Sequence, residues 1–262
     1  YIWFATQVGV SKFDGYTFRN YGIADGLPVN EIESIIEDRK GRIWAGTLGG
    51  GIALFDKVKW TYKNKSLGLC DDFIIKLFED RDGFIWCISK HSGISRVSDD
   101  TITTFTVSGG LSHNTIYCHL IDNSNNLYFG TINGLSILSK NNQGGYKIKT
   151  MLPDISIPDI IQDKKGNIWI AAWDNGIYRY DGKTLYHFGM KEGLPPENVI
   201  CILEDADGKI WAGLENAGIV FYENNRFNVV NNTELQAATI MGMIQDNYKR
   251  IWARSKKEGI FM

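Results

Sequence analysis

A repeat of 41 or 42 residues runs through this sequence and constrains its fold more than any other feature. Seven aromatic anchors mark the copies, and six of the seven are Trp. The anchors are Trp3, Trp44, Trp86, Tyr128, Trp169, Trp211 and Trp252. Similar residues surround each anchor, which indicates that one supersecondary unit is repeated along the whole chain.

The second copy shows what the unit contains. A turn at 38–41 begins with Asp and ends with Gly, as the chemistry of a tight turn requires. Short runs rich in β-branched and aromatic residues lie on either side of it, as is typical of strands. They predict four strands, at residues 32–37, 43–47, 52–55 and 58–62. The next copy begins after Gly68-Leu69, the counterpart of Gly26-Leu27.

Four short strands in a period of about 40–45 residues are typical of a β-propeller blade, so the fold class is all-β. Counting strands gives three in the first copy, four in each of the next five and three in the last. We favour seven blades, with the first and last incomplete in this piece. With six blades, the second and third strands of the last copy would duplicate those of the first copy. We expect residues 1–262 to form a single β-propeller domain and a fragment of a larger protein, which supplies the missing strands.

Charge and composition exclude several classes of protein. The 28 Lys and Arg residues against 30 Asp and Glu residues give a net charge of −2. This balance argues against a nucleic-acid binder, because such proteins carry a basic excess. No run of about 18 apolar residues predicts a membrane span. The chain starts at Tyr1-Ile2-Trp3 without an initiator Met, which also indicates a piece of a longer protein.

No motif indicates a metal, a cofactor or a catalytic nucleophile. The four Cys form no C-x-x-C pair and the four His are scattered, so we expect neither a metal site nor a disulfide framework. Gly-x-Ser-x-Gly, His-Glu-x-x-His and phosphate-loop patterns do not occur. Cys118 and Cys201 share one slot of the first strand, and we expect buried free thiols there and a slot that lines the central channel. We assign no catalytic residue, metal ligand or cofactor.

The seven anchors are interpreted as structural. A large aromatic side chain fills the wedge between neighbouring twisted sheets, and a ligand site would not recur once in every copy. The same argument makes the Asp-x-x-Gly turn structural. Residues that bind a ligand are expected where the repeat departs from its own pattern.

The loops after the second and fourth strands lie at one edge of a blade and contain such departures. The fourth residue after the anchor is Gln7, Leu48, Lys90, Ile132, Trp173, Glu215 or Lys256. Trp173 stands out as one of two Trp outside the anchor series. We predict a ligand-binding rim from aromatic, carboxylate and imidazole side chains, which suit a sugar or a small polar ligand. Its members are Trp173, Asp174, His113, Tyr117, His91 and Asp154. Contact with another domain and plain packing remain alternatives for Trp173.

The second copy closely resembles the two-component regulator propeller repeat. The resemblance is carried by residues 25–32 and 36–47 and by Gly51-Ile52, and again by 193–199 and 204–213 in the sixth copy. Three copies depart from the pattern. The departures are Tyr128 with Asn125-Asn126 in the fourth, Met151-Leu152-Pro153 in the fifth and Glu234-Leu235-Gln236 in the seventh.

The resemblance implies an extracytoplasmic function, because such repeats form the sensor part of membrane-bound regulators. It implies a periplasmic part of an inner-membrane hybrid two-component system. There, two propellers and a small β-sandwich domain precede a transmembrane helix and histidine kinase modules. The implied ligand is a carbohydrate breakdown product. The implied partners are a neighbouring propeller or β-sandwich domain, or a second copy in a homodimer. No chemistry and no membrane insertion are implied for this chain itself.

Two other functions remain open. One is a purely structural scaffold that contributes a dimer or interdomain surface. The other is an enzyme, because virginiamycin-type lyases have a repeat with a comparable Gly-x-x-Trp pattern. A propeller lyase or glycosidase would use a His on the rim. His113 and His91 are the candidates, since His119 and His187 fall inside predicted strands.

Overall fold

The computed structural model describes residues 1–142 and 144–262. Within these residues the chain forms 26 strands in seven antiparallel sheets, together with four short 3₁₀ helices. Strands follow one another across each sheet in chain order, and we call the sheets blades 1 to 7. The chain divides into two compact units, residues 1–116 and 117–262.

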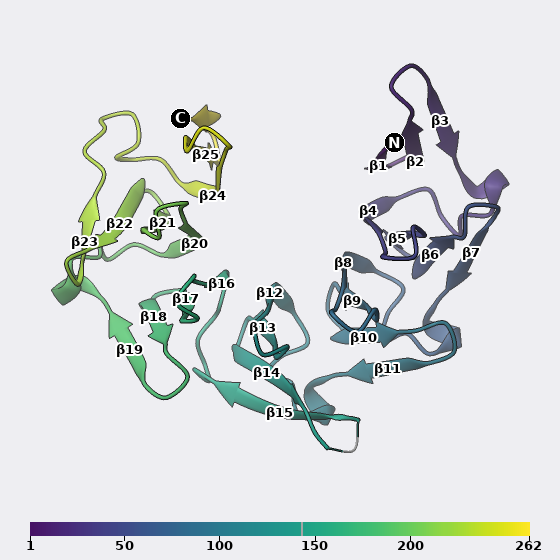
Figure 1. Cartoon of the computed structure of the whole chain (residues 1–262), viewed down its shortest axis with the longest axis horizontal. Helices are drawn as coiled ribbons and strands as arrows, with labels where there is room; N and C mark the ends of the chain where they lie inside the picture. Colours follow the sequence, from purple (N-terminus) through teal and green to yellow (C-terminus); the bar gives the residue numbers. More distant parts are fainter. Residues whose placement is uncertain (143) are drawn as a thin grey trace. The chain divides into compact units, whose positions relative to one another are not determined.

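The first unit holds blades 1 to 3, which follow one another in chain order (Figure 1). Blade 1 contains β1 (Ile2–Thr6), β2 (Gly9–Phe13) and β3 (Phe18–Tyr21). Blade 2 contains β4 (Ile32–Glu37), β5 (Ile43–Thr47), β6 (Ile52–Phe55) and β7 (Trp60–Lys63). Blade 3 contains β8 (Ile74–Glu79), β9 (Ile85–Ser89), β10 (Ile94–Val97) and β11 (Ile102–Phe105).

The second unit holds blades 4 to 7. Blade 4 contains β12 (Ile116–Ile121), which begins at the last residue of the first unit, β13 (Leu127–Thr131), β14 (Gly134–Lys140) and β15 (Tyr146–Met151). Blade 5 contains β16 (Ile160–Gln162), β17 (Ile168–Ala172), β18 (Gly176–Tyr180) and β19 (Leu185–Phe188). Blade 6 contains β20 (Val199–Glu204), β21 (Ile210–Leu214), β22 (Ile219–Glu223) and β23 (Arg226–Val229). Blade 7 contains β24 (Ile240–Gln245), β25 (Ile251–Ser255) and β26 (Ile260–Phe261).

The all-β propeller class and the predicted succession of three-, four- and three-stranded blades are confirmed for the described residues. In the second copy three predicted strands match the observed bounds. The fourth begins at Trp60, because Asp56 holds the preceding residues in a turn by accepting hydrogen bonds from the N–H groups of Val58 and Lys59. That residues 1–262 form one domain stays a prediction.

The Gly-Leu motif joins one blade to the next through a single helical turn. The helices are η1 (Ile23–Asp25), η2 (Lys65–Leu67), η3 (Val107–Gly109) and η4 (Met190–Glu192). Each ends at a Gly with a positive φ, as at Gly68 with φ 108°, a conformation that Gly adopts without strain. The Leu that follows each Gly is 3% exposed, so the motif places an apolar side chain in the core.

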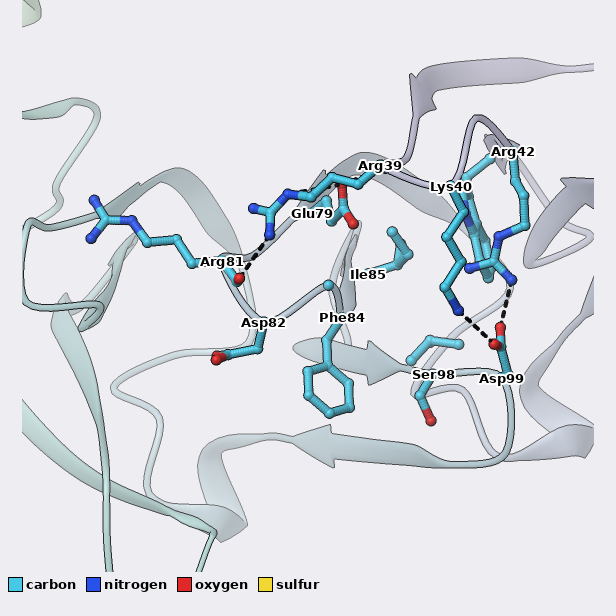
Figure 2. A pocket seen from close by; sticks show the side chains of 13 residues that line it. Arg39, Lys40, Arg42, Glu79, Arg81, Asp82, Phe84, Ile85, Ser98 and Asp99 are labelled. Atoms are coloured by element: carbon cyan, nitrogen blue, oxygen red, sulfur yellow. Dashed lines mark hydrogen bonds and ion pairs between the residues drawn. The ribbon is translucent and has the colours of Figure 1, made fainter.

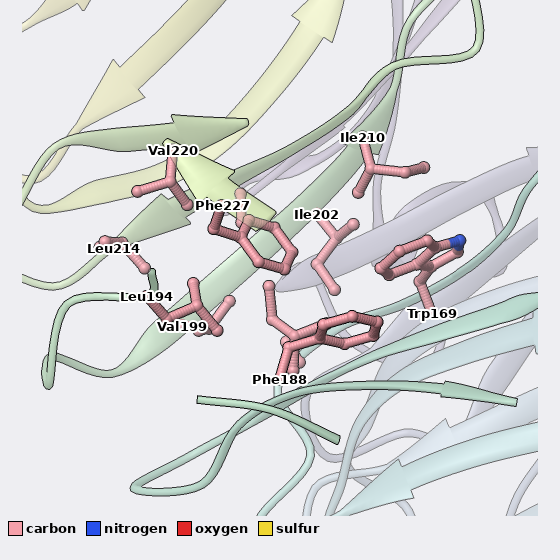
Figure 3. Packing of buried hydrophobic residues seen from close by; sticks show 12 residues of the cluster. Trp169, Phe188, Leu194, Val199, Ile202, Ile210, Leu214, Val220 and Phe227 are labelled. Carbon is pink, nitrogen blue, oxygen red and sulfur yellow. The ribbon is translucent and has the colours of Figure 1, made fainter. Parts of the chain in front are cut away.

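Apolar side chains fill the space between neighbouring blades within each unit. Figure 3 shows the cluster between blades 5 and 6. The ring of Trp169 stacks on Phe188 with centroids 5.6 Å apart, and Phe188 meets Phe227 edge-on at 5.8 Å. Similar clusters join blades 1 and 2, 2 and 3, 4 and 5, and 6 and 7.

The slot that we expected to line a central channel packs on the next blade instead. Cys118 and Cys201 are 8% and 7% exposed, and their Sγ atoms donate to the main-chain oxygens of Ile157 and Ile240 at 3.6 and 3.7 Å. The prediction of a channel-lining slot is therefore wrong for these two residues. Ser34 and Asp159, in the same slot, likewise accept hydrogen bonds from N–H groups of the next blade, those of Leu77 and Ile202, whereas Lys76 is exposed. The prediction of buried free thiols is confirmed for Cys118 and Cys201.

Candidate functional site

At one edge of the blades, which we call the turn edge, the Asp of the Asp-x-x-Gly turn binds the anchor aromatic. In blade 5, Asp163 Oδ2 accepts a hydrogen bond of 2.8 Å from Trp169 Nε1. Its Oδ1 accepts from the N–H groups of Lys165 and Asn167 at 3.0 and 2.8 Å. The same Asp–anchor bond, at 2.7–3.1 Å, joins Asp38 to Trp44, Asp80 to Trp86, Asp122 to Tyr128, Asp205 to Trp211 and Asp246 to Trp252.

At Asp38 and Asp205 the hydrogen bonds to the carboxylate favour its ionised form. Burial alone would raise the pKa of Asp38, but hydrogen bonds from Trp44 and Arg42 outweigh burial and keep that pKa below its usual range. Burial alone would likewise raise the pKa of Asp205, but hydrogen bonds from Trp211 and from the N–H of Lys209 outweigh burial and keep that pKa below its usual range. Trp44 and Trp211 therefore keep a charged acceptor at neutral pH, which supports a structural role for these anchors.

A second repeated contact at the turn edge joins neighbouring blades, and we call it the latch. The N–H that follows the Asp of one blade donates to the side chain that precedes the Asp of the next. Lys164 N–H donates to the two carboxylate oxygens of Glu204 at 3.1 and 3.0 Å. The other latches join Arg39 to Glu79 at 3.0 Å, Asn123 to Gln162 at 2.8 Å and Ala206 to Gln245 at 2.6 Å.

The turn edge is also hollowed into grooves between neighbouring blades. Those between blades 1 and 2, 2 and 3, 4 and 5, and 6 and 7 have volumes of about 480, 360, 340 and 360 Å³. Each is lined by the anchor of its first blade and by the turn of its second, which in blade 7 has Lys249 in the place of Gly. The anchors concerned are Trp3, Trp44, Tyr128 and Trp211.

Charged side chains cross the groove between blades 2 and 3 (Figure 2). Lys40 Nζ and Arg42 Nη1 converge on Asp99 at 2.9 and 2.6 Å. The hydrogen bond from Arg42 is the main reason that the pKa of Asp99 falls to about 2. Arg39 Nη1 donates to the main-chain oxygen of Arg81 at 2.7 Å. These groups satisfy one another, so a ligand would have to displace existing ion pairs.

The opposite edge, which we call the loop edge, contains the candidate rim. There the residue four positions after the anchor is fixed through its backbone, because its N–H donates to the loop that precedes the first strand of the same blade. The pairs, at 2.8–3.0 Å, are Leu48–Glu31, Lys90–Phe73, Trp173–Ser156, Glu215–Asn198 and Lys256–Thr239. Since the backbone makes the contact, the side chain can vary between copies.

Trp173, Asp174, Asp154 and Tyr117 belong to the second unit. Trp173 is 38% exposed and Tyr117 46% exposed. The N–H of Asp174 donates to Asn198 Oδ1 at 2.8 Å, which fixes the loop that carries Trp173. The bond from Trp173 N–H reaches Ser156, two residues from the exposed Asp154. The loop edge of blade 5 thus holds Trp173, Asp174 and Asp154 in one neighbourhood.

His91 and His113 belong to the first unit. His91 is exposed in the β9–β10 loop, beside Lys90. His113 is half-buried, and its Nδ1 accepts a hydrogen bond of 2.9 Å from the N–H of Thr115. The six rim candidates therefore divide between the units, two in the first and four in the second. None of the six lines a groove described above.

The sequence analysis missed two features of the turn edge. The first is the Asp–anchor bond, whose signal is the constant spacing of six residues between Asp and aromatic. The second is the groove between blades 4 and 5, whose signal is the simultaneous change to Asn126 and Tyr128 in the fourth copy.

Three segments, residues 26–49, 151–174 and 193–216, match the family described as two component regulator propeller. These three segments therefore resemble the regulator-propeller repeat. The matched regulator-propeller segments lie in the second, fifth and sixth copies, and the fifth is one of those whose motif departs most from the pattern. No curated protein sequence matches the chain.

Similar folds occur in extracellular domains and in lyases. One is the extracellular domain of the putative hybrid two-component system BT4673 from B. thetaiotaomicron, with 19% identity and a TM-score of 0.65 over 98% of this chain and 36% of that one. The extracellular domain of the putative hybrid two-component system BT3049 of the same organism has 18% identity and a TM-score of 0.53, over 99% of this chain and 50% of that one. A virginiamycin B lyase from Staphylococcus aureus has 16% identity and a TM-score of 0.64, over 97% of this chain and 87% of that one. The chain spans half or less of the two extracellular domains, and at these identities the likeness shows the fold.

No helix in the part of the chain that the structure describes has the length and apolarity to cross a membrane. Within the same residues, no three His, Cys, Asp or Glu side chains gather as a metal site.

Proposed function

We propose that this chain is the ligand-recognition part of a two-component signalling regulator, that it is extracytoplasmic and non-catalytic, and that its ligand is a carbohydrate. The observation that carries the proposal is the match of three segments to the regulator-propeller family. The fold it shares with extracellular domains of two hybrid two-component systems supports it. The fold shared with a lyase supplies no catalytic residue, because fold alone does not determine function.

Signalling would proceed through packing on a partner rather than through large movement inside a blade. Latches and apolar clusters join neighbouring blades within a unit, and the Asp–anchor bonds fix each turn to the anchor of its own blade. A ligand shifts the arrangement of two bodies only by its differential affinity for the two arrangements. A hundredfold shift needs about 2.7 kcal/mol, which one aromatic contact and a few hydrogen bonds supply. The partner would be a neighbouring propeller or β-sandwich domain, or a second copy of the chain.

The loop edge of blade 5 is the surface we propose for this coupling. Trp173 is half exposed on a loop that its own backbone hydrogen bonds hold in place. Asp174, Asp154 and Tyr117 would extend the surface in the second unit. His91 and His113 would serve the same function in the first.

The test is a signalling assay in cells that carry the full-length regulator, grown on a panel of oligosaccharides. The Trp173→Ala variant is expected to lower the ligand-dependent response about tenfold, because it removes the largest exposed side chain of the loop edge. Lys256→Ala, an exposed residue in the same slot of blade 7, is the matched control and should respond like the wild type. An unchanged response in Trp173→Ala would contradict the assignment of this surface. A wild type that answers no carbohydrate would contradict the proposed ligand class and favour a scaffold.

A further inference from the structure

The groove between blades 4 and 5 differs from the other grooves of the turn edge. Its anchor is Tyr128 and not a Trp. In its turn, Asn126 occupies the position directly after the one that is usually Gly. The residue eleven positions after the anchor of the second blade also lines such grooves. It is Phe55 between blades 1 and 2 and Val97 between blades 2 and 3, but it is Tyr180 here. Blade 5 thus presents a hydroxyl where the other two blades present only carbon.

The same position is filled differently in the next pair of blades. Between blades 5 and 6, Tyr222 stands eleven residues after its anchor, and its ring meets Trp169 edge-on with centroids 5.2 Å apart. There the aromatic side chain packs into the apolar cluster. Tyr180 also packs against the apolar cluster between blades 4 and 5, but in addition it lines the groove. Its phenol donates to the main-chain oxygen of Gly182 at 2.7 Å, which fixes its direction and leaves its oxygen able to accept.

Several polar groups of this groove have no partner inside the protein. Among the described residues, the hydroxyls of Ser124 and Ser139 and the ammonium of Lys149 make no hydrogen bond or ion pair. Ser139 is half-buried, whereas Ser124 and Lys149 are exposed at the mouth. These groups supply hydroxyl donors and acceptors and one unpaired positive charge within one groove.

The carboxylate at the base of the groove is already occupied. Asp122 Oδ1 accepts from the N–H groups of Ser124 and Asn126, both at 2.8 Å. Its Oδ2 accepts from Asn126 Nδ2 at 2.8 Å and from Tyr128 Oη at 3.1 Å. Because its two oxygens already accept four hydrogen bonds from its own turn and anchor, Asp122 has little remaining capacity to bind a cation. The charge that faces a ligand is that of Lys149.

We infer that the groove between blades 4 and 5 binds a mono- or disaccharide, and that it prefers one carrying a carboxylate. A volume of about 340 Å³ falls in the range of ligand sites, which begins at about 300 Å³. Ser124, Ser139 and the Tyr180 oxygen match sugar hydroxyls, and the Tyr180 ring offers an apolar face. Lys149 pairs with the carboxylate through a charge-assisted hydrogen bond. The inference rests on the proposed function only for the ligand class.

The test is calorimetric titration of the whole chain with D-glucuronate and with D-glucose. Tyr180→Phe and Ser139→Ala are each expected to weaken glucuronate binding at least about fivefold, by removal of one hydrogen bond. Tyr222→Phe is the matched control for Tyr180→Phe, because it too removes a tyrosine hydroxyl that donates a hydrogen bond. The hydroxyl of Tyr222 donates to Asn225 Oδ1 at 3.0 Å and lies outside the groove. Lys149→Met should remove the preference for glucuronate over glucose. Lys147→Met, an exposed Lys on the same strand that does not line the groove, should keep it.

The outcomes separate the groove from the loop edge. Binding that falls in the groove variants and persists in Tyr222→Phe and Trp173→Ala supports the inference. Binding that falls in Trp173→Ala and persists in the groove variants overturns it while leaving the proposed function intact. Absence of binding of either sugar to the wild-type chain also overturns it. Melting temperatures without sugar show that each variant is folded, so that loss of binding is not loss of structure.

Discussion

At the turn edge, a single carboxylate both closes the turn and accepts the hydrogen bond of the anchor side chain. In blade 5, Asp163 is 7% exposed, closes its turn through two backbone N–H groups and accepts the indole N–H of an anchor that is itself 2% exposed. A buried indole donor costs free energy when it has no acceptor. The Asp residue therefore determines both the direction of the chain after the first strand and the position of the aromatic ring between blades.

At the scale of the residue, we predict that Asp163→Ala lowers the free energy of unfolding by about 3 kcal/mol, because it leaves Trp169 Nε1 and Asn167 Nδ2 without an acceptor. Urea unfolding followed by Trp fluorescence measures the loss. Asp56→Ala is the control, since Asp56 closes an exposed turn by accepting hydrogen bonds from the N–H groups of Val58 and Lys59 and binds no anchor. Equal losses in the two variants would contradict the importance of the indole bond.

At the scale of the element, the latch connects the end of the first strand of one blade to the turn of the preceding blade. The last residue of β20, Glu204, belongs to blade 6 by sequence but accepts the N–H of Lys164 in blade 5. Lys164 returns the contact, because its Nζ donates to the main-chain oxygens of Asp205 and Ala206 at 2.9 and 2.6 Å. Neighbouring blades are thus joined by polar contacts at the turn edge as well as by apolar packing between their faces.

We predict that Glu204→Ala accelerates hydrogen exchange at the N–H of Lys164 about fivefold, through loss of one hydrogen bond to a charged acceptor. The neighbouring N–H of Lys165 is an internal control, because it donates to Asp163 and not across the blades. Glu223→Ala removes an exposed carboxylate elsewhere in blade 6 and should change neither amide. Exchange at Lys164 that is unaffected by Glu204→Ala would show that the latch does not protect this amide.

The elements themselves could be predicted from the sequence, because strand periodicity, turn residues and anchor spacing are local signals. Residues 32–37, 43–47 and 52–55 appear as strands with those bounds. The contacts between elements could not. A Cys in the first strand looks the same whether it faces a channel or the next blade, and only the packing of Cys118 on Ile157 decides. Likewise Tyr128 and Tyr180 lie 52 residues apart in different copies, so no local pattern brings them to one groove.

At the scale of the whole molecule, every cluster and groove described above lies inside one of the two units. The clusters between blades 4 and 5, 5 and 6, and 6 and 7 belong to residues 117–262. Stability in a repeat architecture is close to a sum of terms within repeats and between nearest neighbours. Each unit therefore contains the interactions that its own blades need.

We predict that a fragment of residues 112–262, which keeps β12 whole, folds without the first unit. Its Trp169 and Trp211 indole N–H resonances should match those of the full chain, because the Asp–anchor bonds and the apolar cluster around Trp169 come from the fragment alone. The comparison is made in ¹⁵N-labelled spectra of the two proteins. The fragment also contains all the residues of the groove between blades 4 and 5, so it should bind D-glucuronate as the full chain does. Collapsed spectra in the fragment would mean that contacts beyond nearest-neighbour blades hold the fold. Dispersed spectra without glucuronate binding, when the full chain binds it, would place the sugar outside the groove.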